Sequence, residues 1–167
     1  MTRYTTLLLA LLLAMPGCFK TFELEDEWKP LKVISERPEM LAKDTISTTI
    51  GSTLYVEDIA QWLIRHPIGT PSFISVMRHE QEHSKRQFKK GVFIWLATYL
   101  FDRSFMWHEE QRGYYLALTT PGYHYVPEDV AKNMSNYRNA AGQSMVEYEK
   151  ALKWVIDVRS GQWKPED

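Results

Sequence analysis

From Val56 onward, apolar residues recur at the three- and four-residue spacing of amphipathic helices, and this pattern limits the chain to a mainly helical fold. The expected helices are VEDIAQWLIRH, PSFISVMRHEQEHSKRQFKK, GVFIWLATYLF, RSFMWHEEQRGYYLAL and two more, one after Pro127 and one around Gly142. The strongest strand pattern is STTIGSTLYV, residues 47–56, which is typical of a strand or a short hairpin. The sequence therefore predicts an α+β fold, mainly α, with a small β-element and packed C-terminal helices.

Composition limits the number of domains and the class of partner. The chain has 167 residues, of which 44% are hydrophobic, enough for one sizeable core and therefore for one domain. The aromatic run VFIWLATYLF is expected to belong to that core. With 20 basic and 21 acidic residues, the chain has no net positive charge for a polyanion, so we do not expect a nucleic-acid partner.

The N-terminus has the features of an export signal. Arg3 precedes an apolar run from Leu7 to Met15, which is too short for a comfortable membrane span. Cys18 is the only cysteine, so an intramolecular disulfide is impossible, and a free thiol would be unusual in an oxidising compartment. The segment ending in Gly17 and Cys18 resembles the lipobox of bacterial lipoproteins, although the two residues before Gly17 differ from the usual ones.

This resemblance implies lipidation of Cys18 and a membrane anchor at that residue. We therefore expect a signal and lipobox-like segment at 1–18, a tether leading into the domain at 19–44, and the folded domain at 45–167. The protein would be exported to the cell envelope and face the periplasm or the cell surface. A plain secretory signal and an uncleaved anchor are the alternative interpretations.

The fragment RHEQEH contains the most informative motif, H-E-x-x-H, at His79, Glu80 and His83. Residues four apart lie one above the other on a helix, so the two imidazoles can reach one metal ion at about 2.0–2.1 Å. Glu80 is turned about 100° from His79, which suits a general base beside the metal. This spacing is an established signature of zinc hydrolases. The alternative is the solvated polar face of an ordinary helix.

Two histidines leave a zinc site short of a ligand, and WHEEQRGYY supplies candidates for the third. Glu110 is separated from His83 by a segment long enough to form a connecting helix and return. Apolar neighbours on its predicted helix suggest that this side is buried, where a carboxylate needs a partner. His108 and Glu109 compete with Glu110 for this role, and a solvated helix start is an equally good interpretation of these three residues alone.

Residues 48–118 resemble the gluzincin branch of the zincin metallopeptidases, through TTIGSTLYV, HEQEH and WHEEQRGYY. The resemblance implies a minimal zincin-like domain in which His79, His83 and Glu110 bind Zn²⁺. Gly113 and Tyr114 occupy the small and aromatic positions after the third ligand. In such enzymes the strand before the active helix pairs with a peptide substrate. That role would fall to residues Thr49, Gly51 and Thr53.

A transition-state oxyanion needs a donor besides the metal, and the loop GYHYVP offers Tyr123 and His124. The alternative for these aromatic residues is packing on the surface of the core.

The expected function is that of a zinc metallopeptidase with Glu80 as catalytic base and a protein or peptide as substrate. One alternative is a noncatalytic envelope lipoprotein that binds a partner. Its histidines would be solvated or would hold structural zinc, with His108 or Glu109 as a fourth ligand. A further alternative is a hydrolase acting on the peptide cross-links of a cell wall.

Overall fold

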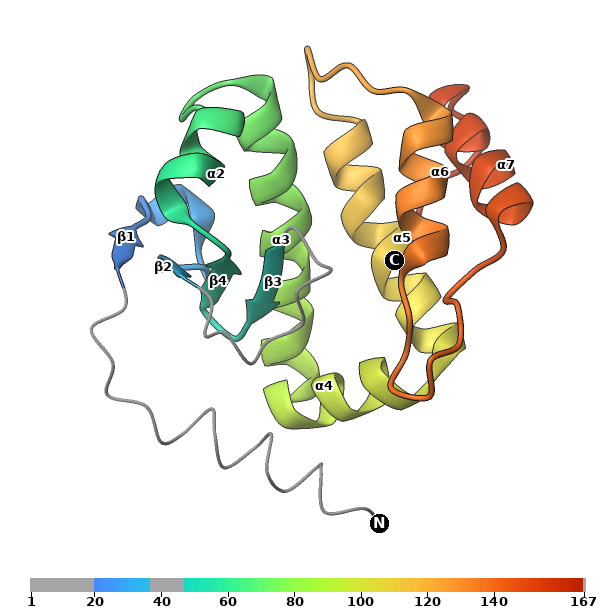
Figure 1. Cartoon of the computed structure of the whole chain (residues 1–167), viewed down its shortest axis with the longest axis horizontal. Helices are drawn as coiled ribbons and strands as arrows, with labels where there is room; N and C mark the ends of the chain where they lie inside the picture. The colour runs from blue at the N-terminus through green and yellow to red at the C-terminus, as the bar shows by residue number, and fades with distance from the viewer. Residues whose placement is uncertain (1–19, 37–46, 167) are drawn as a thin grey trace.

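The computed structural model describes residues 20–36 and 47–166, which form a small sheet and six α-helices (Figure 1). The strands are β1 (Thr21–Glu23), β2 (Val33–Glu36), β3 (Ser47–Ile50) and β4 (Thr53–Val56), with the 3-10 helix η1 (Asp26–Trp28) between β1 and β2. The helices are α2 (Ile59–Arg65), α3 (Pro71–Lys90), α4 (Val92–Phe101), α5 (Arg103–Leu118), α6 (Pro127–Asn136) and α7 (Tyr148–Arg159). The prediction of a mainly helical α+β fold is confirmed.

The sheet has the strand order β1-β2-β4-β3, with β2 and β4 parallel and the other two pairs antiparallel. β3 and β4 form a hairpin that turns at Gly51, whose φ of 59° favours glycine. The hairpin expected over residues 47–56 is therefore present. β1 and β3 are the two edge strands, and β3 packs beside α3.

The segment expected to be a tether contributes to the fold. Residues 20–36 form β1, η1 and β2, and within them Leu31 and Ile34 are fully buried. Strands of three and four residues are too short for an alternating pattern to stand out among charged neighbours. The ordered fold therefore begins about two dozen residues before residue 45, the predicted start of the domain. The predictions about residues 1–19 and 37–46 concern segments outside the described residues.

Helix α3 is the longest helix of the described chain, and its start is well defined by sequence. The side chain of Thr70 accepts a hydrogen bond from the backbone N–H of Phe73, and Pro71 occupies the first turn. The helix stops at Gly91, which has a φ of 90°. Its buried face passes from apolar residues at the N-terminal end to polar residues, among them the motif histidines, further along.

The buried apolar side chains of the described residues form two clusters, whereas composition alone predicts one core. The first lies between the sheet, α2 and the start of α3; its members are Leu31, Ile34, Leu54, Val56, Ile59, Trp62, Phe73 and Met77. The second joins α5, α6 and α7; its largest members include Met106, Trp107, Met134, Trp154 and Val155. Helices α3 and α5 pack side by side between these clusters (Figure 1), and the buried polar residues gather along this contact.

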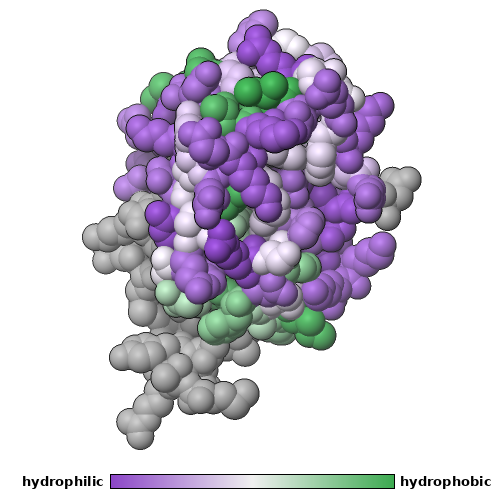
Figure 2. Space-filling model, turned by 90° about the vertical axis from the view of Figure 1, so that its right-hand side faces the viewer, coloured by the Kyte–Doolittle hydropathy of each residue, from purple (hydrophilic) through white to green (hydrophobic). Residues whose placement is uncertain are grey.

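The sequence predicts that helix α4 belongs to the core, but the structure buries only one of its residues. Trp95 is its one buried residue, whereas Phe93, Ile94 and Phe101 are more than half exposed. The helix crosses the ends of α3 and α5, so that only one side of it meets the rest of the fold (Figure 1). The α6–α7 side of the molecule is mainly hydrophilic (Figure 2). Among residues 20–36 and 47–166, we find no helix long and apolar enough to span a membrane.

Candidate metal centre

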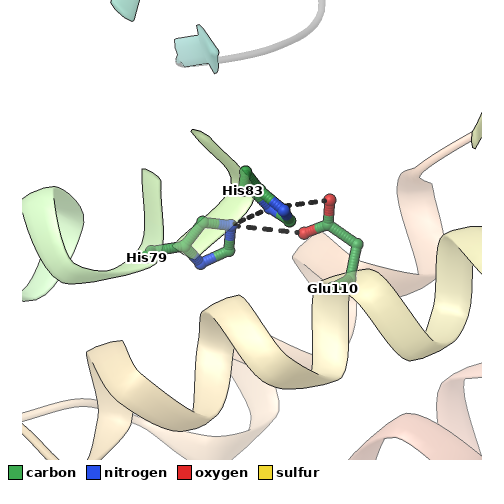
Figure 3. A group of neighbouring side chains, drawn as sticks. All are labelled: His79, His83 and Glu110. Carbon is green, nitrogen blue, oxygen red and sulfur yellow. Dashed lines mark hydrogen bonds and ion pairs between the residues drawn. The ribbon is translucent and has the colours of Figure 1, made fainter. Parts of the chain in front are cut away.

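Three side chains from α3 and α5 converge in the buried layer between the two clusters: His79, His83 and Glu110 (Figure 3). The Nε2 atoms of the two histidines lie 2.9 Å apart. Glu110 Oε2 is 3.5 Å from His79 Nε2, and Glu110 Oε1 is 3.5 Å from His83 Nε2. One turn of α3 thus presents both imidazoles to a carboxylate from the neighbouring helix.

This donor set fits zinc. Two imidazoles and one carboxylate are a common ligand set of catalytic zinc sites, and tetrahedral ligands at the usual bond lengths stand about 3.3 Å apart. The two Nε2 atoms are slightly closer than this value, and each lies slightly further from a different oxygen of Glu110. One donor atom from each of the three residues lies within 4.8 Å of the others. In addition, Glu110 Oε2 is buried and has no hydrogen-bond partner in the described part of the chain. A buried acceptor without a partner is costly, and a cation bound between the three side chains would satisfy it.

Gly113 and Tyr114 shape the space around His79. A Cβ atom at Gly113 would lie only 2.8 Å from His79 Nε2, so any larger residue would push the imidazole away. The ring of Tyr114 meets the edge of the same imidazole, with the ring centres 4.8 Å apart. These residues, which the gluzincin resemblance places in the small and aromatic positions, therefore both contact His79.

Glu110 has a second neighbour that the sequence does not reveal. The hydroxyl of Tyr99, on α4, donates a hydrogen bond of 2.5 Å to Glu110 Oε1. Burial and the negative charge of Glu110 raise the pKa of Tyr99 well above its ordinary value, so the phenol stays a donor. The Tyr99 ring stacks on Trp95, which in turn contacts the ring of His83. Helix α4 therefore closes one side of the cluster.

Electrostatics couple His83 to Glu110. Burial by itself lowers the pKa of His83, but the charge of Glu110 and its hydrogen bond outweigh this effect and raise the pKa to about 9. Two opposing effects also act on the pKa of Glu110. Burial by itself raises this pKa, but the two histidines outweigh burial and hold it well below the usual value. In metal-free protein the cluster is therefore an ion pair, and a metal must displace its proton. His83 Nδ1 has no partner among the described residues, whereas metal-binding histidines usually donate through this second nitrogen.

Glu80 is held by the edge strand β3. Its Oε1 accepts a 2.7 Å hydrogen bond from Ser47 Oγ, and its Oε2 accepts one of 2.7 Å from Thr49 Oγ1. The side chain is buried next to the histidine pair. Each carboxylate oxygen has a second lone pair, so the two bonds fix the orientation of Glu80 without using up its capacity to accept a proton.

The expected substrate strand is occupied by contacts with α3. Gln87 donates to the carbonyl of Thr49 and accepts from the N–H of Gly51, and Ser84 donates to the carbonyl of Gly51. These backbone groups therefore have internal partners. Thr53 lies on β4, paired with strands on both sides. Of the three residues expected to bind substrate, Thr49 alone reaches the site, and it does so through its side chain.

The competing ligand candidates point elsewhere. The carboxylate of Glu109 accepts two hydrogen bonds from Arg86, at 2.5 and 2.7 Å, and one from the indole of Trp95 at 3.0 Å. His108 is exposed, and its Nδ1 pairs with the carbonyl of Ser104. The ligand group found among the described residues therefore has three members, without His108 or Glu109.

The expected oxyanion residues lie at the end of α5. Tyr123 is partly buried against the helical cluster and stacks with Tyr125, whereas His124 is exposed. Both line a separate cavity of about 340 Å³ with residues of α5 and α7. None of the residues lining that cavity belongs to the His79, His83 and Glu110 group.

Comparisons of this chain with protein-family models, with curated proteins and with solved structures give no significant match. The evidence on function therefore comes from the site residues, His79, His83 and Glu110, and their surroundings.

Proposed function

We propose that the protein is a zinc-dependent peptidase of the zincin type, in which His79, His83 and Glu110 hold the metal. The observation that carries the proposal is the convergence of these three buried side chains, where Glu110 Oε2 faces His79 and has no hydrogen-bond partner in the described chain. Zinc in such a site polarises a carbonyl group and lowers the pKa of water.

Glu80 is the catalytic base in this proposal. Held by Ser47 and Thr49, it takes a proton from the water that attacks the carbonyl carbon of the scissile amide. The proton then passes from Glu80 to the amide nitrogen as the carbon–nitrogen bond breaks, which regenerates the carboxylate. Tyr99 keeps the carboxylate of Glu110 oriented by donating to Oε1, so that Oε1 faces His83 and Oε2 faces His79.

The three-membered ligand set supports a catalytic over a structural site. A structural zinc site is closed by four protein ligands, whereas a catalytic site keeps one position for water or substrate. The two residues that could close this site from α5 are engaged elsewhere, Glu109 with Arg86 and Trp95, and His108 with Ser104. A peptide of a cell wall would be hydrolysed by the same chemistry as a protein substrate.

Export and lipidation at Cys18 complete the proposal. They depend on the sequence of residues 1–18, which lie outside the described part of the chain.

The test measures zinc content and peptide turnover together. We expect about one zinc per wild-type chain and cleavage of a fluorogenic peptide library. His79→Ala should lose the metal. Glu80→Gln should keep the metal and lose turnover by about 100- to 10,000-fold, the usual share of a general base. His108→Ala is the matched control, because it removes an exposed histidine that lies outside the ligand group.

Two results would contradict the proposal. Zinc retained at full strength by His79→Ala would show that the metal binds elsewhere. Glu80→Gln with wild-type turnover would remove the base from the mechanism. Stoichiometric zinc in a wild type that cleaves no member of the library would favour the noncatalytic lipoprotein with a structural metal.

A further inference from the structure

Helix α4 has two different faces, and only one of them is explained by the metal centre. Trp95 and Tyr99 point inward and contact Glu109 and Glu110. On the opposite side, Phe93, Ile94 and Phe101 are 55%, 62% and 60% exposed. The exposed residues follow the spacing of one helical stripe, and none of the residues 92–101 is charged. We call Phe93, Ile94 and Phe101 the α4 patch.

The α4 patch lies at one end of the molecule, where the described fold places nothing over it. Helix α4 runs across the lower end in Figure 1, and hydrophobic side chains gather at that end in Figure 2. Three exposed apolar side chains of this size on one uncharged helix mark an interaction surface in a folded protein.

Basic residues flank the patch. Three basic residues, Lys89, Lys90 and Arg103, lie next to the ends of α4, and the acidic residue beside them is Asp102. Lys89 and Lys90 are exposed just before α4, and Arg103 is exposed just after it. Asp102 is engaged in capping α5, where its side chain accepts from two backbone N–H groups. The surroundings of the patch are therefore positively charged.

We propose that the outer face of α4 lies on an anionic lipid surface. Apolar and aromatic side chains enter the boundary between headgroups and acyl chains, while flanking lysine and arginine residues contact lipid phosphates. A second copy of the chain is a poorer partner, because a two-fold contact through the patch would bring two basic rims together. The inference goes beyond the proposed function and does not depend on it.

The arrangement places the metal centre directly behind the lipid-contacting face. The same ten-residue helix that carries the patch also carries Tyr99, the donor to Glu110. The protein is thus oriented at the membrane by one side of α4 while the other side supports the candidate ligands.

A site-specific probe tests this inference on the full chain. Cys18→Ser removes the only native cysteine, and Ile94→Cys then carries an environment-sensitive fluorophore in the patch. Ile156→Cys in the same background is the matched control, because Ile156 is another half-exposed isoleucine, on α7. The local readout separates α4 from any membrane contact made by residues 1–19. Vesicles contain phosphatidylcholine alone or mixed with phosphatidylglycerol.

With anionic vesicles, the probe at position 94 should shift to shorter wavelength and gain emission severalfold, while the probe at position 156 stays unchanged. Lys89→Glu combined with Lys90→Glu should abolish the shift. Circular dichroism confirms that each variant is folded. The inference is overturned if the two probes respond alike, or if neutral vesicles give the same shift. It is also overturned if the shift at 94 arises without lipid as protein concentration rises, which would indicate a second copy.

Discussion

Glu109 and Glu110 are adjacent on α5, and both are almost completely buried, yet their surroundings differ. Glu109 accepts hydrogen bonds at both carboxylate oxygens, from Arg86 and Trp95. Glu110 has Tyr99 and the imidazole of His83 at one oxygen, while its other oxygen faces His79 and has no hydrogen bond among the described residues. The first carboxylate is neutralised by a permanent cation, and the second only by a histidine that can lose its proton.

The comparison separates a buried carboxylate with a fixed structural partner from one that is a candidate metal ligand. Arginine stays charged at any relevant pH, so Glu109 and Arg86 form a fixed connection between α3 and α5. At Glu110 the protein leaves an acceptor open and surrounds it with two potential metal ligands. A buried carboxylate is thus a candidate metal ligand when its acceptors are incompletely satisfied, and the same burial indicates a structural role when they are all used.

The largest expected effect distinguishes the two glutamates directly. Glu110→Ala should weaken zinc binding by at least about 100-fold, because it removes one of three ligands. Glu109→Ala should lower the free energy of unfolding by about 2–3 kcal/mol, since it leaves Arg86 uncompensated, and should keep the zinc stoichiometry. Zinc titration and urea unfolding measure both. Equal loss of zinc in the two variants would erase the distinction.

The second prediction concerns pH and uses the titratable partner of Glu110. The pKa of His83 is raised from 6.5 to about 9 in the folded, metal-free protein. Its contribution to stability is therefore fully present below pH 6.5 and is lost as pH rises through 9, a change on the order of 3 kcal/mol. Chemical unfolding of chelator-treated protein at pH 6, 7.5 and 9 measures it.

The control for this pH effect is His83→Gln, which keeps a polar side chain and should flatten the profile across that interval. The hydrogen bonds from Arg86 to Glu109 raise the pKa of Arg86 further, so this guanidinium stays charged across the interval and adds no slope. A wild-type profile that is flat or rises between pH 6.5 and 9 would contradict the assignment of His83 as the partner of Glu110.

A smaller effect is expected from Gly113→Ala. The added methyl group would approach within 2.8 Å of His79 Nε2, so the imidazole must move from its place beside Glu110. We expect zinc affinity to fall by about 10- to 100-fold, the usual range for residues that orient ligands. Alanine is the better helix former by up to about 1 kcal/mol, so loss of fold is not the expected cause. Unchanged affinity would mean that the site tolerates a displaced His79.

The smallest effect is expected from Tyr99→Phe, which removes one hydrogen bond to Glu110 and keeps the ring that stacks on Trp95. Zinc affinity should fall by about 10-fold, because the carboxylate loses the donor that orients it. Tyr125→Phe, a partly buried tyrosine outside the ligand group, is the matched control. If both variants bind zinc equally well, Tyr99 serves packing alone.

Local sequence patterns predicted the elements that carry the candidate site. The spacing of His79 and His83 placed both on one helical face, and the glycine between two β-prone stretches predicted the β3–β4 hairpin. Glu110 was predicted from the gluzincin resemblance and from apolar neighbours on its helix. The predictions of the helix and of the β-element succeed because helical and strand periodicities are set by the backbone and extend over only a few residues.

Partners that are distant in the chain were not predictable in the same way. The bonds from Ser47 and Thr49 to Glu80, and from Tyr99 to Glu110, depend on how β3 and α4 pack against α3 and α5. Hydroxyl groups of serine, threonine and tyrosine carry no spacing signal of their own. The apolar composition of residues 92–101 predicted a helix in the core, but only one face of α4 packs against the described fold.

The sequence by itself determined a mainly helical chain. The spacing of His79, Glu80 and His83 also placed two imidazoles and a carboxylate close together on α3. Tertiary packing decided which glutamate of α5 joins them, because Glu109 and Glu110 differ by one residue and their partners come from other elements. It also decided that α4 has an exposed apolar face, since burial of a helix depends on what packs against it and a run of apolar letters does not specify that.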